Sequence, residues 1–413
     1  MEPPVITELM AQALENPNLL SLAAGFTDNA VLPKEEVRKA VERLSAGDSE
    51  YLQYGTNQGR PGLRQAAADW CAGYPGEVAG SYGAGSVLIT NGSQQCLYLA
   101  MQVLCDPGDL VLVERPTYFV FLEMLKGLGI RPVGIPALPD GKLDAEGLEN
   151  LLGALTASGE ARRLRAVYLV SYHSNPSARC LGEEEKNRVA EALSSHELRI
   201  PVLEDGAYRD LYFEKPHPAR TTLSLPAYDS FPKLFLGTFT KPLATGMKIG
   251  FGVCTDPEWM ERMLAAKGHQ DFGSSNFCQA IVEDLLVRGA YESLLAIQRA
   301  HYREKASRMA AALESSGLRD AGWDWSEPTG GLLVWVKGPE GLDTGIGSSF
   351  CEACIAEGVL YVPGDLSFTG GAPKNYVRLS FGAIGEERMA EACRRFGKVA
   401  VAFSGSFSVA GKG

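Results

Sequence analysis

The sequence has no segment that could cross a membrane or direct export. No run approaches the ~20 consecutive apolar residues that a bilayer-spanning helix needs. The first ten residues, MEPPVITELM, lack the basic stretch and the following apolar stretch of a secretory signal. The nine cysteines have irregular spacings, and an odd number cannot all pair. We therefore expect reduced thiols in a soluble, cytoplasmic protein with no membrane partner.

Residues with the spacing of a metal site are also scarce. Cys351 and Cys354 form a single C-x-x-C, but no second pair and no nearby histidine completes a four-ligand zinc set. The stretch around them has the pattern of a helix. We predict that the protein holds no metal.

Positive charge is in deficit, with 39 Lys and Arg against 50 Asp and Glu and a formal net charge of −11. Nucleic-acid backbones and anionic lipid head groups would be repelled on average by such a protein, which argues against partners of either kind. Internal repeats and blocks of like charge are absent as well. Small molecules remain as the expected partners, and the 45% hydrophobic content permits a packed core.

The middle of the 413-residue chain repeats one pattern: a short apolar run, a polar or glycine turn, then a stretch of helical periodicity. This alternation predicts an α/β fold. The candidate strands are mostly apolar on both faces, as buried strands are. They are Ser86–Thr90, Leu110–Glu114, Arg131–Ile135, Ala166–Ser171, Pro201–Glu204, Leu234–Thr238 and Ile249–Cys254.

The pattern changes after Ala290, which indicates a second, smaller lobe. One long helix is expected through Ser316. After it we expect a strand at Leu332–Val336, a helix near Ser349–Glu357, a strand at Tyr376–Phe381 and a final helix. We therefore expect a large domain over residues 49–287 and a small α+β domain over 288–413. Residues 1–48, in which Pro33 opens a helix over Lys34–Leu44, are expected to pack with the small domain.

Polar residues follow the candidate strands, at the edge where α/β sheets bind ligands. Asn91, Gly92 and Ser93 lead from the first strand into an amphipathic helix. Such a helix start can hold a phosphate on its unpaired N–H groups, and a glycine lets the backbone approach. An ordinary helix cap by Asn91 or Ser93 is the alternative.

Lys241 lies in a loop rich in hydroxyl groups between two apolar strands, in the run LFLGTFTKPLATGMKIGFGV. A desolvated lysine loses proton affinity and becomes a nucleophile toward aldehydes. Thr238, Thr240 and Lys248 are close enough in sequence to contact a phosphate. Taken alone, however, a lysine in such a loop is more often a surface residue.

Asp205, Tyr208 and Asn175 also follow strands. A buried carboxylate at Asp205 needs a cationic partner, which is either a protonated ring nitrogen or a structural arginine, unless the residue caps a helix. Asn175 either donates to a phenolate oxygen or simply begins a turn before Pro176. The residues alone leave these alternatives open.

Together these segments resemble the class I/II aminotransferases, and the likeness extends from about Leu20 to Phe381. The motifs stand in family order: LSLAAGFTDNAVLP, YLQYGTNQGRPGLRQAAADW, ITNGSQQCLYLA, VERPTYFVFLEML, SNPSARCLG, LEDGAYRDLYF, GTFTKPLATGMKIGFG, TGGLLVWV and NYVRLSFG. The resemblance implies the aspartate-aminotransferase-like fold, with a mostly parallel seven-stranded sheet between helices in the large domain. It also implies pyridoxal phosphate as the cofactor and a homodimer with shared active sites.

The resemblance assigns chemical roles to five residues. Lys241 would carry the cofactor as an internal aldimine and later move the proton of the substrate. Asp205 would keep the pyridinium nitrogen protonated so that the ring accepts electrons. Asn175 and Tyr208 would bond the phenolic oxygen, and Tyr118 would stack on the ring.

The remaining roles concern the phosphate and the substrate. Residues expected around the phosphate are Gly92, Ser93, Gln94, Thr238 and Lys248. Tyr54 would join them from the other subunit of the dimer. Arg378 would grip the substrate carboxylate with its two-pronged guanidinium, near the Gly25 backbone and Asn175.

Two positions depart from the family pattern. Lys248 stands where the family usually has arginine, and a lysine offers a point charge in place of a bidentate fork, so we expect weaker cofactor binding. The family's asparagine-proline-threonine-glycine is Asn175-Pro176-Ser177-Ala178 here, a change that alters the turn at the pocket edge.

Three functions fit these residues. Transamination between an L-amino acid and a 2-oxo acid, with 2-oxoglutarate as the expected acceptor, is the first. A pyridoxal-phosphate lyase, such as a cysteine-conjugate β-lyase, is the second, because the same residues stabilise the same carbanion. The third, an effector domain of a transcription regulator, is disfavoured because the family likeness begins too early to leave room for a DNA-binding module.

Overall fold

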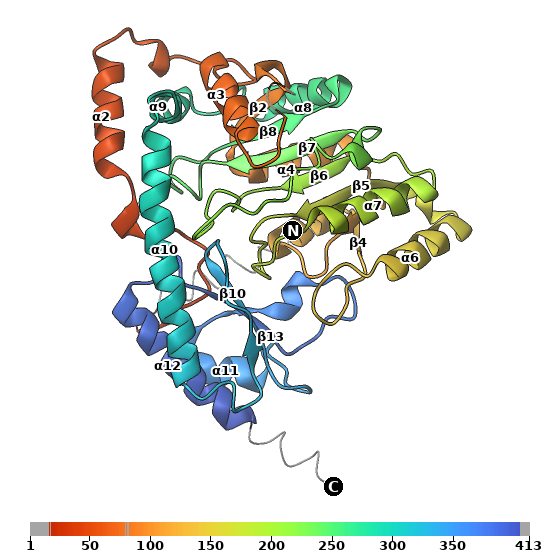
Figure 1. The fold of residues 1–413 in the computed structure, drawn as a ribbon, viewed down its shortest axis with the longest axis vertical. Coiled ribbons are helices and arrows are strands. Elements are labelled where there is room, and N and C mark those ends of the chain that lie inside the picture. The colour runs from red at the N-terminus through yellow and green to blue at the C-terminus, as the bar shows by residue number, and fades with distance from the viewer. Residues whose placement is uncertain (1–15, 17, 79, 81, 405–413) are drawn as a thin grey trace.

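Two lobes lie one above the other along the long axis of the molecule (Figure 1). The computed structural model describes residue 16 and residues 18–78, 80 and 82–404. The outer parts of the predicted terminal segments, residues 1–15 and 405–413, lie outside this described set, as do residues 17, 79 and 81. None of the helices formed by the described residues is both long enough and apolar enough to cross a bilayer.

The upper lobe is built on a seven-stranded sheet, and each strand lies within two residues of its predicted limits. The strands, in sheet order, are β2 (Val87–Asn91), β8 (Ile249–Cys254), β7 (Lys233–Thr238), β6 (Val202–Asp205), β5 (Leu164–Val170), β3 (Leu110–Val113) and β4 (Arg131–Gly134). β8 runs antiparallel to both neighbours, and the other pairs are parallel. The prediction of a mostly parallel sheet is confirmed.

Helices cover both faces of this sheet because its strands are apolar on both sides. In β3, Val111 and Val113 pack into one core cluster, while Leu110 and Leu112 pack into the cluster on the opposite face. The first face carries α4 (Gly92–Leu104), α5 (Phe119–Gly127) and α8 (Pro257–Gln270). The other carries α3 (Pro61–Ala72), α6 (Ala145–Ala157), α7 (Glu183–Ser195) and α9 (Asn276–Val287).

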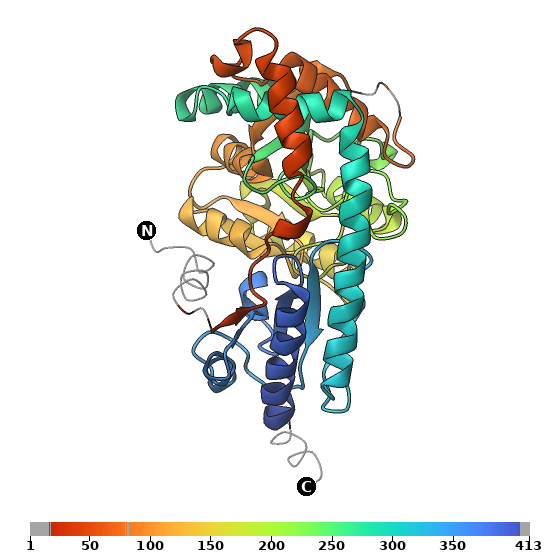
Figure 2. The same ribbon diagram turned by 90° about the vertical axis from the view of Figure 1, so that its left-hand side faces the viewer.

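The lower lobe contains a four-stranded antiparallel sheet packed with helices. Its strands, in sheet order, are β12 (Val362–Pro363), β13 (Tyr376–Ser380), β10 (Leu333–Lys337) and β9 (Asp324–Trp325). Its helices are α10 (Ala290–Ser315), α11 (Ser349–Ala356) and α12 (Glu386–Ser404). Figure 2 shows α10 running beside both lobes. The predicted small α+β domain is therefore present, and Cys351 and Cys354 lie on α11 as expected.

The N-terminal segment contacts both lobes. Strand β1 (Leu20–Ser21) pairs in parallel with β11 (Val359–Leu360) of the lower lobe. Helix α2 (Lys34–Ser45), at the place predicted, packs against α9. The division into domains at residues 48/49 and 287/288 stays a prediction. Short 3-10 helices complete the described chain: η1 (Asn29–Val31), η2 (Glu50–Leu52), η3 (Ala84–Ser86), η4 (Glu160–Arg163), η5 (Pro226–Tyr228) and η6 (Gly364–Ser367).

Candidate active site

Lys241 lies between β7 and β8, with its side chain turned inward to the N-terminal segment. Its Nζ donates a hydrogen bond to the carbonyl oxygen of Gly25. Burial lowers the pKa of Lys241 to about 8, and the positive charges of Arg378 and Lys248 add to this effect. About a tenth of the amine is therefore neutral at pH 7, far more than for a solvated lysine, and this buried amine can act as a nucleophile.

Asp205 ends β6 and is buried. Its Oδ2 accepts a hydrogen bond from the hydroxyl of Tyr168 at 2.8 Å, and its Oδ1 accepts one from the backbone N–H of Ala207 at 2.9 Å. Burial raises the pKa of Asp205 even though both bonds lower it. No arginine or lysine of the described residues forms an ion pair with this carboxylate, so a cationic ring nitrogen would supply the missing partner.

The start of α4 fits an anion. Gly92 is its first residue and has a φ of +70°, a left-handed conformation that favours glycine. The Asn91 side chain makes no capping hydrogen bond to the helix, and its Nδ2 donates to Asp271 at 2.9 Å. A Cβ at Gly250 would lie 2.5 Å from the Ser93 nitrogen, so β8 packs directly on the helix start. The alternative of an ordinary cap by Asn91 is excluded, and the helix N–H groups are available for a phosphate.

The other predicted phosphate residues lie around this helix start. The Thr238 hydroxyl accepts from the Thr240 N–H at 3.0 Å. The Thr240 Oγ1 itself is 3.4 Å from where a Gly92 Cβ would lie. Gln94 accepts a bond from the Tyr118 hydroxyl at 3.2 Å. Lys248 is exposed and has a φ of +57°, so its backbone holds a conformation that is uncommon for lysine.

Arg378 on β13 crosses from the lower lobe to the upper one. Its Nη1 donates to Asn175 Oδ1 at 3.0 Å, and its Nη2 donates to the carbonyl oxygen of Ala23 at 2.6 Å. The guanidinium lies 5.4 Å from the ring centre of Phe119. Its buried Nε has no hydrogen-bond partner among the described residues. A buried, unsatisfied N–H is costly, and a substrate carboxylate would satisfy it.

Tyr118 and Tyr208 complete the cluster. Burial raises the pKa of Tyr208 to about 12, and the positive charge of Arg378 opposes that rise. Burial also raises the pKa of Tyr118, and the charges of Tyr208 and Asp205 contribute to the rise. Both phenols therefore stay protonated at neutral pH and can donate hydrogen bonds.

Tyr54 is apart from these residues. Its side chain is 85% exposed and meets Phe272 edge-on, with ring centres 5.8 Å apart. It makes no hydrogen bond to the residues of the cluster within the described chain. Tyr54 is expected to act in the neighbouring subunit, and its exposed position is compatible with that role.

Three contacts of the site were not predicted from the sequence. Tyr168, Phe119 and Ala23 hold Asp205 or Arg378, yet Tyr168 and Phe119 look like ordinary core aromatics in their apolar runs. Ala23 acts through its backbone, which no residue type reveals. One feature of the sequence could have indicated the contact: Tyr168 lies in the predicted strand that directly precedes the strand ending near Asp205, and the two strands pair.

These residues fit pyridoxal phosphate: an amine for its aldehyde, an acid for its ring nitrogen, a helix start for its phosphate. With the seven-stranded sheet and the small lobe, they define the class as pyridoxal-phosphate enzymes of the aspartate-aminotransferase-like fold. The family model "Aminotransferase class I and II" matches residues 17–396. The chain belongs to this family and is a pyridoxal-phosphate-dependent aminotransferase.

Curated relatives and solved structures agree. The chain is similar to a 2-aminoadipate transaminase of Thermus thermophilus, at 32% identity over 95% of this chain and 92% of that protein. An aromatic-amino-acid aminotransferase of Thermococcus litoralis is 31% identical over 94% of this chain and 89% of its own length. The kynurenine aminotransferase of Pyrococcus horikoshii, solved in complex with PMP, superposes with a TM-score of 0.87 at 29% identity, covering 98% of this chain and 95% of that one.

Proposed function

We propose that the protein moves the amino group of an L-amino acid to a 2-oxo acid, with 2-oxoglutarate as the acceptor. The convergence of Lys241 and Arg378 on one short segment carries this proposal. Lys241 donates to the carbonyl of Gly25 and Arg378 to that of Ala23. An amino acid whose carboxylate is held by Arg378 thus presents its α-carbon toward Lys241. Because a 2-oxo acid carries the same carboxylate, one arginine serves both substrates.

The chain's own groups then handle the proton and the charge. Pyridoxal phosphate, when bound, supplies the electron sink. Lys241 Nζ takes the proton from the α-carbon and returns it, and its lowered pKa suits this work near neutral pH. Asp205 would keep a proton on the ring nitrogen of the bound cofactor. Tyr208 and Asn175 would donate to the phenolic oxygen of the bound cofactor, and Tyr118 would stack on its ring.

The phosphate is proposed to lie at the start of α4. The group that would hold it comprises Gly92, Ser93, Gln94, Thr238 and Lys248. The uncapped helix start supports this assignment. Lys248 supplies a single flexible charge, so we expect the cofactor to dissociate more readily than from a variant with arginine at this position.

We also propose a homodimer that shares its active sites, with Tyr54 reaching the phosphate of the partner subunit. Exposed apolar side chains gather around Tyr54 and support such an interface: Leu52 is 65% exposed and Phe272 64%. A monomeric, fully active enzyme in light scattering would refute this proposal. The free thiols of the nine cysteines support a cytoplasmic location.

The test is an absorbance spectrum of the protein with added pyridoxal phosphate, for the wild type and Lys241→Ala. We expect a cofactor band that depends on Lys241, disappears with some amino acids and returns with 2-oxoglutarate. Release of pyruvate and ammonia would indicate the lyase instead. A spectrum that does not depend on Lys241 would contradict the assignment of that residue.

A further inference from the structure

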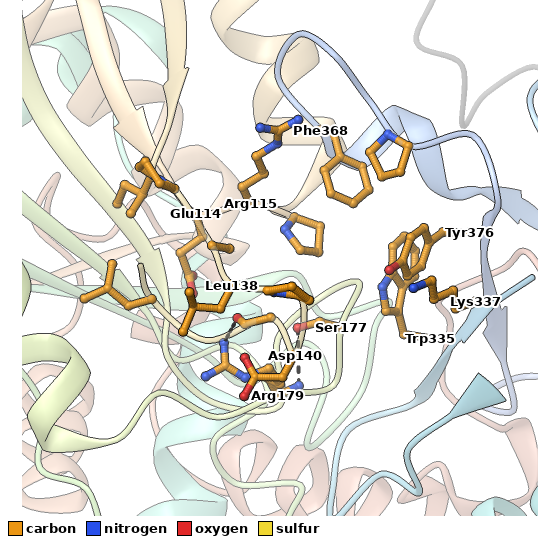
Figure 3. Close-up of a pocket in the computed structure, with 18 of the residues that line it drawn as sticks. Glu114, Arg115, Leu138, Asp140, Ser177, Arg179, Trp335, Lys337, Phe368 and Tyr376 are labelled. Atoms are coloured by element: carbon orange, nitrogen blue, oxygen red, sulfur yellow. Dashed lines mark hydrogen bonds between the residues drawn. The ribbon is translucent and has the colours of Figure 1, made fainter. Parts of the chain in front are cut away.

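A large cleft lies between the two lobes, beside the site described above. Its volume is about 880 Å³, within the range of small-molecule pockets. One wall comes from the upper lobe, at the ends of β3 and β4, and the other from the sheet of the lower lobe (Figure 3). Among the described residues, its lining includes neither Lys241 nor Asp205 nor Arg378. The cleft is therefore a separate candidate site.

The lower-lobe wall is aromatic. Trp335 and Tyr376 stack with ring centres 5.2 Å apart and an interplanar angle of 19°. Phe368 lies 6.2 Å from Trp335 and 6.0 Å from Tyr376. All three rings are only partly buried, and Figure 3 shows them facing Leu138 across the cleft. This wall offers a flat aromatic ring a surface on which to stack.

Two cations flank this wall without acidic partners. The Arg115 guanidinium lies 5.9 Å from the ring centre of Phe368, and its Nη2 donates to the carbonyl oxygens of Gly370 and Gly371. Its Nε and Nη1 have no hydrogen-bond partner among the described residues. Lys337 lies 6.0 Å from the ring centre of Tyr376 and forms no ion pair within the described chain. The free Nε and Nη1 groups of Arg115 each offer a charged N–H donor to an anion.

The acidic groups of the cleft are mostly engaged elsewhere. Glu185 pairs with Arg179 at 2.7 Å. Asp140 pairs with Lys142 at 3.1 Å, and Asp324 pairs with Arg319. The lining also contains Glu114, whose carboxylate accepts the Val170 N–H and whose pKa is raised to about 8 by burial, so it is largely neutral at pH 7. Glu340 remains as an exposed carboxylate at the rim.

We propose that this cleft is a second binding site, for a planar aromatic carboxylate. Its ring stacks on Trp335 and Tyr376, and its carboxylate accepts a hydrogen bond from a free N–H group of Arg115, with Lys337 as the second cation. The stacked aromatic wall selects a flat ring, and the two unpaired cations select a negative charge. The site requires neither the cofactor nor the transamination proposed above.

Occupancy of the cleft would reach the active site through the lower-lobe sheet. Trp335 is the strand partner of Arg378 on β10 and β13, and Tyr376 is two residues from Arg378 on the same strand. These three side chains therefore project from one face of the sheet. A ligand on Trp335 thus lies on the same face of the sheet that carries the carboxylate-binding arginine.

The test is calorimetric titration of the holoenzyme with indole-3-carboxylate, which has a fused ring and a carboxylate but no amino group. Arg115→Gln and Lys337→Gln are compared with Arg131→Gln, which removes an exposed arginine from the far end of β4. We expect each cleft variant to raise the Kd roughly tenfold and the control to leave it unchanged, as loss of one charge-assisted bond implies. The kcat/KM of the cleft variants for an amino acid should match that of the control.

Three results would overturn the proposal. The first is an absence of binding to the wild type at about 1 mM ligand. The second is a Kd within twofold of the wild type in both cleft variants, which would confine the ligand to the active site. The third is binding that weakens as protein concentration rises, which would assign the cleft to a contact between copies of the chain. Lys337 is exposed, so its variant tests the site even if the Arg115 variant folds poorly.

Discussion

Replacing Tyr168 by phenylalanine tests how much the Tyr168 hydroxyl stabilises the ionised form of Asp205. Tyr168 is fully buried and its ring centre lies 4.1 Å from that of Phe121, so a phenylalanine ring can keep the same packing. Only the 2.8 Å hydrogen bond to Asp205 is lost. A hydrogen bond to a charged group contributes about 1.5–3 kcal/mol. At about 1.36 kcal/mol per pKa unit, the pKa of Asp205 should rise by about one to two units above its already raised value.

A higher pKa makes Asp205 a poorer partner for a protonated ring nitrogen. We expect kcat for transamination to fall about 10- to 100-fold, and the acid limb of the kcat profile to move to higher pH, because Asp205 acts in its ionised form. Tyr228→Phe is the matched control, since it removes another buried hydroxyl, which donates at 2.6 Å to the Lys186 carbonyl and not to Asp205. If Tyr168→Phe keeps kcat within twofold of the control and the same acid limb, the reasoning is refuted.

Three further predictions concern the site and its support. Capture of pyridoxal phosphate by the apo-enzyme, followed in a stopped-flow spectrometer, should accelerate with pH around a midpoint of about 8, because the neutral amine of Lys241 reacts; a midpoint near 10.5 would contradict the lowered pKa. Arg378→Lys should lower kcat/KM for amino acids about 100-fold in steady-state assays, since the bidentate contact is lost, and a loss below threefold would remove Arg378 from carboxylate binding. Lys186→Met should cost about 3–5 kcal/mol in denaturant unfolding, because it leaves Glu204 buried without its 2.7 Å partner. The double variant that also carries Glu204→Leu should recover most of that stability, and failure to recover it would mean that packing dominates.

The large sheet could be predicted from the sequence because its strands are short, apolar and separated by turns. Leu110–Val113, for example, is a run of four apolar residues that are all buried. Such a short run, apolar on both faces, is typical of a central strand and not of a helix. The meeting of Asn175, Asp205 and Lys241 also followed from the sequence, since residues after the strands of such a sheet converge at one edge. Their individual roles in catalysis stay predictions.

Other features depend on contacts that the local pattern does not contain. Strands β1 and β11 have two residues each, too few for any periodicity, and they exist because they pair across the chain. The amphipathic pattern of α2 indicates one buried face but does not identify α9 as its partner. Trp335 looks like a core residue of an apolar strand, yet it is only partly buried and lines the cleft between the lobes.

The segment Ala23–Gly25 has a consequence for how the protein is made. Its carbonyl groups bond to side chains that lie 216 and 355 residues further along the chain. During synthesis the segment leaves the ribosome early, whereas β13, which carries Arg378, is one of the last strands to emerge. The Ala23 carbonyl therefore lacks its partner until late in translation. A nascent chain therefore cannot bind a substrate carboxylate until translation is nearly finished.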